Sequence, residues 1–515
     1  MSRSKTLLCT VALAASGLLA QVPAPPPLIH LSIVALNASG EPVTDLTASD
    51  FKIVDQTKPQ TIFAFHKPPE PAAPLAQLEY SNRPAGAAPH ATVLLFDMMN
   101  MNQADRLDTW KDLDKSLPQL ESGESIYFYV LNLEGALVPI HAMGPKSASD
   151  KTWPQEAAGE LDKAMKAASH GRPVQLGNED QVKRTYKALE ELGNQLAAFP
   201  GRRDIVWVTN GVPATWDPKN SKCKSMDMER AHGTWGGGGA PSGDPRTEGQ
   251  VTDARGALSS GMSTGGDWID CGLYVPHLQV TLEKDAVGVN PMSHSRDLNP
   301  DVNRDLEQMA LLTGGHNYYR DSARTVLEKV ARAGASTYSI AYDPSAQNWD
   351  NKFHMVHVTC ERPGVKLQVR ERYYAMADSR PAQDRMKAVL MTAFQSPSDV
   401  SDIGLRTKIA PAEGGKGVHL EIRINPSDVV LREQGGKFAG AVYLLISDRG
   451  AAGALGEPTV SSFNLDLTPE QHAIVLKEGI PLSQDHPTSD AVRQIRLIVL
   501  DQNTNASGSL TFPIK

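Results

Sequence analysis

The sequence is poor in cysteine, in positive charge and in long apolar runs, and these shortages exclude several classes of protein. Four cysteines among 515 residues are too few for a small scaffold held together by disulfides. The net charge of −8 argues against a general nucleic-acid binder, because such proteins need a basic face to neutralise phosphates. Beyond the N-terminus there is no apolar run of the roughly 20 residues that span a membrane, so we expect no transmembrane segment in the mature chain.

The sequence does contain enough apolar residues to build several cores. Hydrophobic residues make up 40% of the chain, and charged residues make up 21%. At about 150 residues per domain, a chain of 515 residues predicts three domains or four. The 41 glycines and 36 prolines indicate many turns and connecting segments.

The N-terminus has the pattern of a secretory signal peptide. Arg3 and Lys5 precede an apolar run that ends in small residues at Ala20. This run is shorter than a membrane span of about 20 residues, and a cluster of prolines beginning at Pro23 would stop a helix. We therefore predict that residues 1–20 are cleaved near Ala20 and that the protein is exported to the periplasm or the exterior.

The middle of the chain alternates between apolar strands and helices. Residues 91–97 form a continuous apolar strand that ends in an acid, as buried strands of a parallel sheet do. Residues 126–131 and 204–210 are similar, and amphipathic segments lie between these strands. This alternation predicts a doubly wound, Rossmann-like α/β domain over residues 91–376. The Gly-rich stretch 214–272 interrupts it, and we interpret that stretch as a surface insertion.

Short β segments flank this domain on both sides. Residues 21–66 contain a few short strands that cannot bury much core alone, so we expect this small β unit to pack on the rest of the chain. Residues 67–90 are rich in Pro and Ala and are interpreted as a linker. Residues 385–515 contain strands of alternating polarity, which predict a β-sandwich domain.

Three cysteines remain after removal of the predicted signal peptide. Cys223 and Cys271 bracket the Gly-rich insertion, and export would place them in an oxidising compartment, so they are the candidate disulfide. Three free thiols are the alternative, because the sequence cannot establish that the two Cα atoms come within about 7 Å. Cys360 follows a strand-like apolar segment and is interpreted as an inert core thiol.

The order of these strands and motifs resembles a von Willebrand factor A (VWFA) domain. More narrowly, the chain is similar to the secreted VWFA-related proteins that are common in acidobacteria. Besides the strand that ends at Asp97, the resemblance rests on residues 43–51, 200–213, 312–315 and 338–344. It covers about residues 28–376.

The resemblance implies a metal site that has degenerated. VWFA domains use an Asp-x-Ser-x-Ser motif after the first strand, a loop threonine and an aspartate after the fourth strand. Asp97 matches the first position, but Met99 and Met101 occupy both serine positions, and a thioether is a poor ligand for magnesium. Asn210 replaces the later aspartate. We therefore predict neither a bound metal ion nor a cofactor.

Ligands of doubly wound folds bind outside the carboxyl ends of the strands, which predicts a partner-binding surface at Asp97, Asn100, Asn102 and Asn210. The resemblance implies an exported, non-catalytic binding or adhesion-type protein, whose partner is an unidentified protein or envelope ligand. A secreted hydrolase that uses the insertion or the sandwich domain, and a purely structural envelope component, are the alternatives. No nucleophile, base and oxyanion donor can be assembled from the sequence, which disfavours an enzyme.

Overall fold

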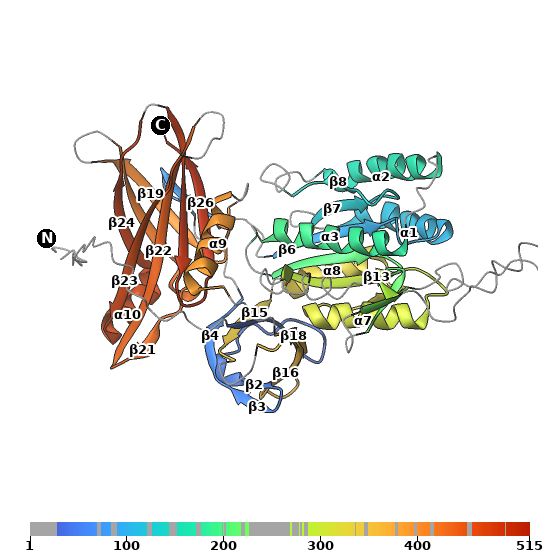
Figure 1. Cartoon of the computed structure of the whole chain (residues 1–515), viewed down its shortest axis with the longest axis horizontal. Helices are drawn as coiled ribbons and strands as arrows, with labels where there is room; N and C mark the ends of the chain where they lie inside the picture. The colour runs from blue at the N-terminus through green and yellow to red at the C-terminus, as the bar shows by residue number, and fades with distance from the viewer. Residues whose placement is uncertain are drawn as a thin grey trace, which may run out of the picture.

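The computed structural model describes most of the chain between residues 28 and 514. The described residues are 28–68, 74–83, 90–120, 126–143, 152–170, 177–197, 199, 202–217, 222–225, 268–269, 278, 281–282, 287–334, 336–344, 349–375, 380–395, 399–412, 417–450, 456–489 and 491–514. The predicted signal peptide over residues 1–20 lies outside them. Figure 1 shows three bodies, which are a helix-covered central sheet, a small β domain and an elongated β domain near the C-terminus.

The central body is a six-stranded sheet whose spatial order is β14-β13-β9-β6-β7-β8. All neighbouring strands are parallel except β7 and β8. Strands that are added outward on both sides of the first one make a doubly wound sheet. The strands are β6 (His90–Asp97), β7 (Ile126–Leu131), β8 (Leu137–His141), β9 (Arg202–Val208), β13 (Val287–Ser293) and β14 (Tyr318–Tyr319).

Helices cover both faces of this sheet and create two apolar cores. One core lies under α1 (Gln103–Ser116), α2 (Trp153–His170) and α8 (Ala323–Gly334), and the other lies under α3 (Asn178–Leu196) and α7 (Pro300–Thr313). Successive side chains of β6 enter different cores, with Leu95 in one and Phe96 in the other. Burial on both faces explains why β6 and β7 have continuous apolar sequences. The expected mixed α/β architecture is therefore confirmed.

The small β domain is built from chain segments on both sides of the α/β domain. One sheet has the order β17-β1-β15-β4, the other has the order β18-β16-β2-β3, and an apolar core lies between them. The strands are β1 (Ile29–Leu36), β2 (Phe51–Asp55), β3 (Lys58–Gln60), β4 (Ile62–His66), β15 (Thr337–Tyr342), β16 (Phe353–Cys360), β17 (Lys366–Gln368) and β18 (Arg372–Tyr374). The strands expected over residues 21–66 are thus completed by strands that follow α8.

This arrangement corrects the α/β domain expected over residues 91–376. The sequence pattern predicts β15 in the central sheet, but β15 pairs antiparallel with β1 and β4, and Ile29 lies opposite Tyr342. The α/β domain ends with α8 instead. The sequence pattern cannot tell whether β15 belongs to the central sheet or to the small β domain. Five of its six residues are buried, and a strand in either sheet would need such an apolar sequence.

The C-terminal body is a sandwich of two antiparallel sheets around one apolar core. The first sheet contains β5 (Glu79–Ser81), β19 (Leu405–Pro411), β20 (Val418–Ile424) and β24 (Ile480–His486). The second contains β21 (Arg432–Gln434), β22 (Lys437–Gly450), β23 (Thr459–Leu467), β25 (Val492–Asp501) and β26 (Ser507–Pro513). Two helices that the sequence analysis did not predict belong to this body, α9 (Ala382–Gln395) on the outer face of β22 and β25, and α10 (Pro469–Glu478) before β24.

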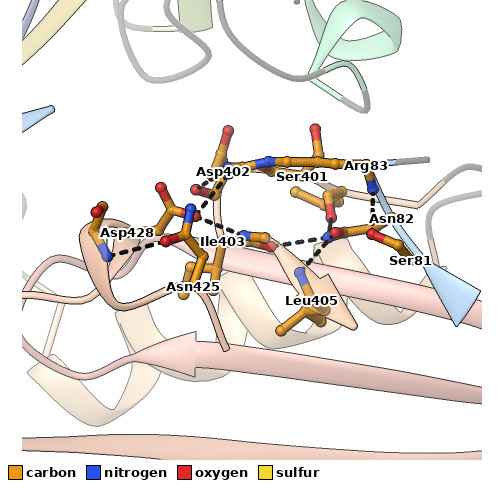
Figure 2. A network of polar contacts seen from close by, with 12 residues as sticks. Ser81, Asn82, Arg83, Ser401, Asp402, Ile403, Leu405, Asn425 and Asp428 are labelled. Carbon is orange, nitrogen blue, oxygen red and sulfur yellow. Dashed lines mark hydrogen bonds and ion pairs between the residues drawn. The ribbon is translucent and has the colours of Figure 1, made fainter. Parts of the chain in front are cut away.

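The segment expected to be a linker over residues 67–90 contributes a strand to the C-terminal sandwich. β5 pairs antiparallel with β19 and forms one edge of that sheet. Asn82, which follows β5, donates from its side-chain amide to the carbonyl oxygens of Val400 and Ile403, both at 2.9 Å. Figure 2 shows this network, in which the backbone N–H of Leu405 donates back to Asn82 Oδ1 at 2.8 Å. The linker interpretation is therefore wrong for this part of the segment.

Arg83 strengthens the same attachment. Its guanidinium donates to the carbonyl oxygen of Ser401 at 3.0 and 2.5 Å and to Asp428 at 2.8 Å. A planar guanidinium can satisfy several acceptors at once, which a lysine could not. Proline and alanine dominate the composition of the segment. The sequence therefore gives no signal for the three-residue strand β5 or for the hydrogen bonds of Asn82 and Arg83 that hold it.

The Gly-rich stretch 214–272 contains three short antiparallel strands, β10 (Ala214–Asp217), β11 (Lys222–Ser225) and β12 (Trp268–Ile269). Residues 226–267 lie outside the described residues. The candidate disulfide stays a prediction, because Cys271 and the side chain of Cys223 also lie outside them. Cys360 is a free thiol that packs, partly buried, against the core of the small β domain. No helix in the described part of the chain is long and apolar enough to cross a membrane.

Candidate functional site

Asp97 ends β6 and is fully buried at the carboxyl edge of the central sheet. Its carboxylate accepts from the backbone N–H of Asn100 at 3.1 Å and from the Asn100 amide at 2.7 Å. The indole N–H of Trp207 and the hydroxyl of Thr209 also donate to it, each at 3.0 Å. Burial raises the pKa of Asp97 above its ordinary value, and these hydrogen bonds oppose that shift. Through these hydrogen bonds, the carboxylate links the loop after β6 to the end of β9.

Asn100 extends this network to a helix. Its amide Nδ2 donates to Thr185 Oγ1 on α3 at 2.7 Å, and Thr185 in turn donates to the carbonyl oxygen of Gln181 at 2.8 Å. The Oδ1 atom of Asn100 is buried and has no hydrogen-bond partner among the described residues. Asn100 is thus a buried link between the loop after β6 and α3, and not an exposed contact residue.

A second network joins Asn102 to Asn210. Asn102 caps α1 by accepting from the backbone N–H of Asp105 at 2.8 Å, and its amide donates to Asp105 Oδ2 at 2.9 Å. Asn210 donates to the same oxygen at 2.6 Å. Ser293, the last residue of β13, donates to Asn210 Oδ1 at 2.8 Å. The structure therefore brings the four predicted site residues to one edge of the sheet, but only Asn102 is exposed there.

The methionines of the loop after β6 face inward. Met98, Met99 and Met101 are all buried, and Met99 joins the core under α3 and α7 while the other two join the opposite core. Met99 and Met101, the two positions that the resemblance aligns with ligand serines, therefore have their side chains in the apolar cores. Within the part of the chain that the structure describes, no three His, Cys, Asp or Glu side chains are grouped so that they could hold a metal ion.

The exposed part of this edge carries tyrosine and arginine. Arg296 follows β13, Tyr319 ends β14, and Arg320 comes next with an unusual φ of 62°. The Tyr319 hydroxyl and the Arg320 guanidinium both donate to the carbonyl oxygen of Arg296, at 3.3 and 2.7 Å. The Arg320 guanidinium also lies 5.1 Å from the centre of the Tyr319 ring. Among the described residues, neither arginine forms an ion pair with a carboxylate.

A narrow cleft opens beside Trp207, on the side of the sheet that α3 and α7 cover. Its volume is about 30 Å³, and its lining includes Tyr186, Asp305 and Met309. Burial, together with the nearby charge of Asp305, raises the pKa of Tyr186 above its ordinary value. The phenol therefore stays protonated at neutral pH and can donate a hydrogen bond within a cleft where Asp305 is the one charged lining residue among those described.

Several residues of these networks were missed by sequence analysis. Thr209 and Ser293 stand at or next to the carboxyl ends of two parallel strands, so the rule that ligands gather at this edge could have drawn attention to them. Thr185 and Asp105 lie within helices, and no sequence signal indicates that they meet Asn100 and Asn210.

No family model matches this chain, and no curated protein matches it. Among solved structures, the vWF domain of the type V pilus tip protein Mfa5 from Porphyromonas gingivalis is 10% identical at a TM-score of 0.26, and the match covers 48% of this chain and 95% of that one. The pilus adhesin SpaC from Lactobacillus rhamnosus GG is 11% identical at a TM-score of 0.25, with 90% of this chain and 57% of that one covered.

Proposed function

We propose that this chain is an exported binding protein of the adhesion type, and that its VWFA-like domain is non-catalytic and recognises a partner without a metal ion. The recognition surface is the carboxyl edge of the central sheet. It comprises the exposed Asn102 and the group Arg296, Tyr319 and Arg320. The motif resemblance to VWFA-related proteins of the acidobacterial type supports this assignment, and the location follows the general rule for doubly wound sheets.

The hydrogen bonds of Asp97 are the main support for recognition without a metal ion. Its carboxylate accepts from Asn100, Trp207 and Thr209 and is fully buried, so a cation would have to displace donors of the chain itself. Mg²⁺ requires a near-octahedral shell of oxygen ligands, and the buried methionines of the same loop offer none. The buried network instead acts as a rigid support for the exposed residues around it.

The chemistry of the exposed residues indicates an acidic partner. The Arg320 guanidinium and the backbone carbonyl of Arg296 lie beside Tyr319, and neither arginine pairs with a carboxylate among the described residues. Tyrosine and arginine are the residues most enriched in the energetic centres of protein interfaces, and arginine binds carboxylates through two parallel hydrogen bonds. We therefore expect the partner to present Asp or Glu side chains, or another anionic group of the cell envelope.

Binding to an envelope extract tests the location of the surface. Tagged full-length protein should retain a defined set of envelope components, and the double variant Tyr319→Ala/Arg320→Ala should lose them. Arg304→Ala is a matched control, because Arg304 is an exposed arginine on α7 that pairs with Asp301 within its own helix. Equal capture by the double variant and the wild type would place recognition elsewhere on the chain.

Adding metal ions tests the proposal that recognition does not depend on a cation. A ligand that binds only the folded chain raises its melting temperature, so millimolar Mg²⁺ or Ca²⁺ should leave the melting temperature unchanged. Partner capture should likewise survive EDTA. A rise in melting temperature that the Asp97→Ala variant abolishes would mean that a cation does bind at this position.

A further inference from the structure

A serine, a histidine and an aspartate meet on the surface of the C-terminal sandwich, far in sequence from the edge described above. The Ser483 hydroxyl lies 3.0 Å from His419 Nε2, and His419 Nδ1 lies 2.6 Å from Asp485 Oδ1. We propose that Ser483, His419 and Asp485 form a hydrolytic triad that cleaves carboxylic esters. This activity is independent of the proposed binding function, because it belongs to another domain.

The pairing of two strands brings the three residues together. β20 and β24 are antiparallel neighbours, with His419 opposite Asp485 and Glu421 opposite Ser483. Alternate residues of a strand share a face, so Ser483 and Asp485 project on the same side as His419. That side is the outer face, because Leu420 and Leu482, which follow His419 and precede Ser483 and project to the opposite side, are buried. Strand register, and not a mobile loop, thus places His419 beside two residues that lie 64 and 66 positions later in the sequence.

The order of the contacts fixes the role of each group. A carboxylate can only accept, so the contact with Asp485 requires that neutral His419 carries its proton on Nδ1. His419 Nε2 is then the acceptor that faces the Ser483 hydroxyl. This is the arrangement in which a histidine acts as the general base for a serine, while an acid holds the ring in the required tautomer.

The chemical step is acyl transfer through the serine. Ser483 Oγ forms a bond to the ester carbonyl carbon while His419 Nε2 takes the hydroxyl proton. The bond from that carbon to the alcohol oxygen breaks, and His419 returns the proton to the leaving alkoxide, which departs as the alcohol. Water then attacks the acyl-serine with the same base, which releases the carboxylic acid and restores Ser483.

The surroundings of the triad indicate the class of substrate. The site lies on an open sheet face, where the His419 side chain is 33% exposed and that of Asp485 is 63% exposed. β24 is an edge strand, so alternate backbone N–H groups point away from β20 and can stabilise an oxyanion on a chain lying alongside. Because the face is open to water, the site stabilises the oxyanion only weakly. Such a site favours esters over amides, which are less reactive. We therefore assign the site to esters carried on an extended polymer.

Hydrolysis of p-nitrophenyl acetate by the full-length protein tests the proposal. We expect Ser483→Ala and His419→Gln each to lower the second-order rate constant by about 100-fold, the low end of the range for general-base catalysis. Ser462→Ala, which removes an exposed serine on β23, should retain the wild-type rate. All of these positions are surface positions, and circular dichroism verifies that each variant folds.

The site of acylation separates a triad from an isolated reactive histidine. Peptide mapping of the wild type, quenched in acid during turnover, should find the acetyl group on Ser483. The corresponding amide, p-nitroacetanilide, should not be cleaved. An acetyl group on His419 or on lysines only, or an unchanged rate in Ser483→Ala, would show that the three residues are a structural hydrogen-bond network.

Discussion

Acidification should loosen the junction between the small β domain and the C-terminal sandwich, because His30 is held there in its neutral form. Burial lowers the pKa of His30 from 6.5 to about 4, and the nearby positive charge of Arg370 adds to this effect. Asp402, from the C-terminal part of the chain, opposes the shift, and His66 at the end of β4 reinforces it. Between pH 6.5 and about 4, His30 is therefore mostly neutral in the folded chain and mostly protonated in the unfolded chain.

The sign and size of the effect follow from linkage. Between pH 6.5 and about 4 the unfolded state binds more protons than the folded state, so stability falls as the pH falls through this window. One pKa unit corresponds to about 1.4 kcal/mol, so the difference amounts to about 3 kcal/mol. His30 keeps some of its surface in contact with solvent, which makes this an upper figure.

Native-state hydrogen exchange measures this loss locally, which suits a chain of several domains. Amides of β1 and β15 should lose protection between pH 6.5 and 4.5, after correction for the intrinsic exchange rate. The His30→Gln variant, whose amide does not titrate, should flatten that dependence, while His357→Gln is the matched control on an exposed strand position of the same domain. If His30→Gln follows the wild-type curve, the buried ring is not the source of the effect.

Three substitutions test the packing described above. Asp204→Ala leaves the Arg202 guanidinium buried without its 2.9 Å partner, and we expect equilibrium denaturation to show a loss of about 3–5 kcal/mol. Gly315→Ala would place a methyl group 1.9 Å from the carbonyl oxygen of Val289, so its melting curve should show a loss of about 1–3 kcal/mol, and a wild-type curve would contradict the close approach of α7 to β13. Arg83→Met removes the anchor of β5, and the amides of β5 should exchange faster while those of the central sheet are unchanged.

The central sheet could be predicted because its physical signals are local. β6 lies where the sequence places it, and β9 (Arg202–Val208) overlaps most of the strand predicted over residues 204–210, since a strand buried on both faces needs an apolar sequence whatever its neighbours are. A glycine that follows an amphipathic helix is a local signal of the same kind, and Gly314, which caps α7, adopts the left-handed conformation with a φ of 75°. The rule for the carboxyl ends of parallel strands then placed Asp97, Asn100 and Asn210 near one another.

The remaining features depend on which strands pair, and a single sequence does not record pairing. β15 has the same apolar character in either sheet, so its partner β1 could not be identified. Asp97 and Asn100 were correctly placed at the edge, but their burial was missed because it depends on Trp207 and Thr209 from another strand. The meeting of Ser483 with His419 is a consequence of β20–β24 register alone, which no local pattern reveals.

The small β domain and the C-terminal sandwich each combine chain segments from before and after the α/β domain, and this has a consequence for biosynthesis. Glu79 in β5 precedes its partner Arg406 by 327 residues, and Leu46 precedes Tyr338 by 292. At synthesis rates of about 5–20 residues per second, β5 has no partner strand for roughly 15–65 s after it is made. The α/β domain, which is contiguous in sequence, can complete its sheet in that interval, and the small β domain can follow once β15 to β18 have been made. We therefore expect β5 to remain an open strand until β19 appears, and to depend on a chaperone that covers it.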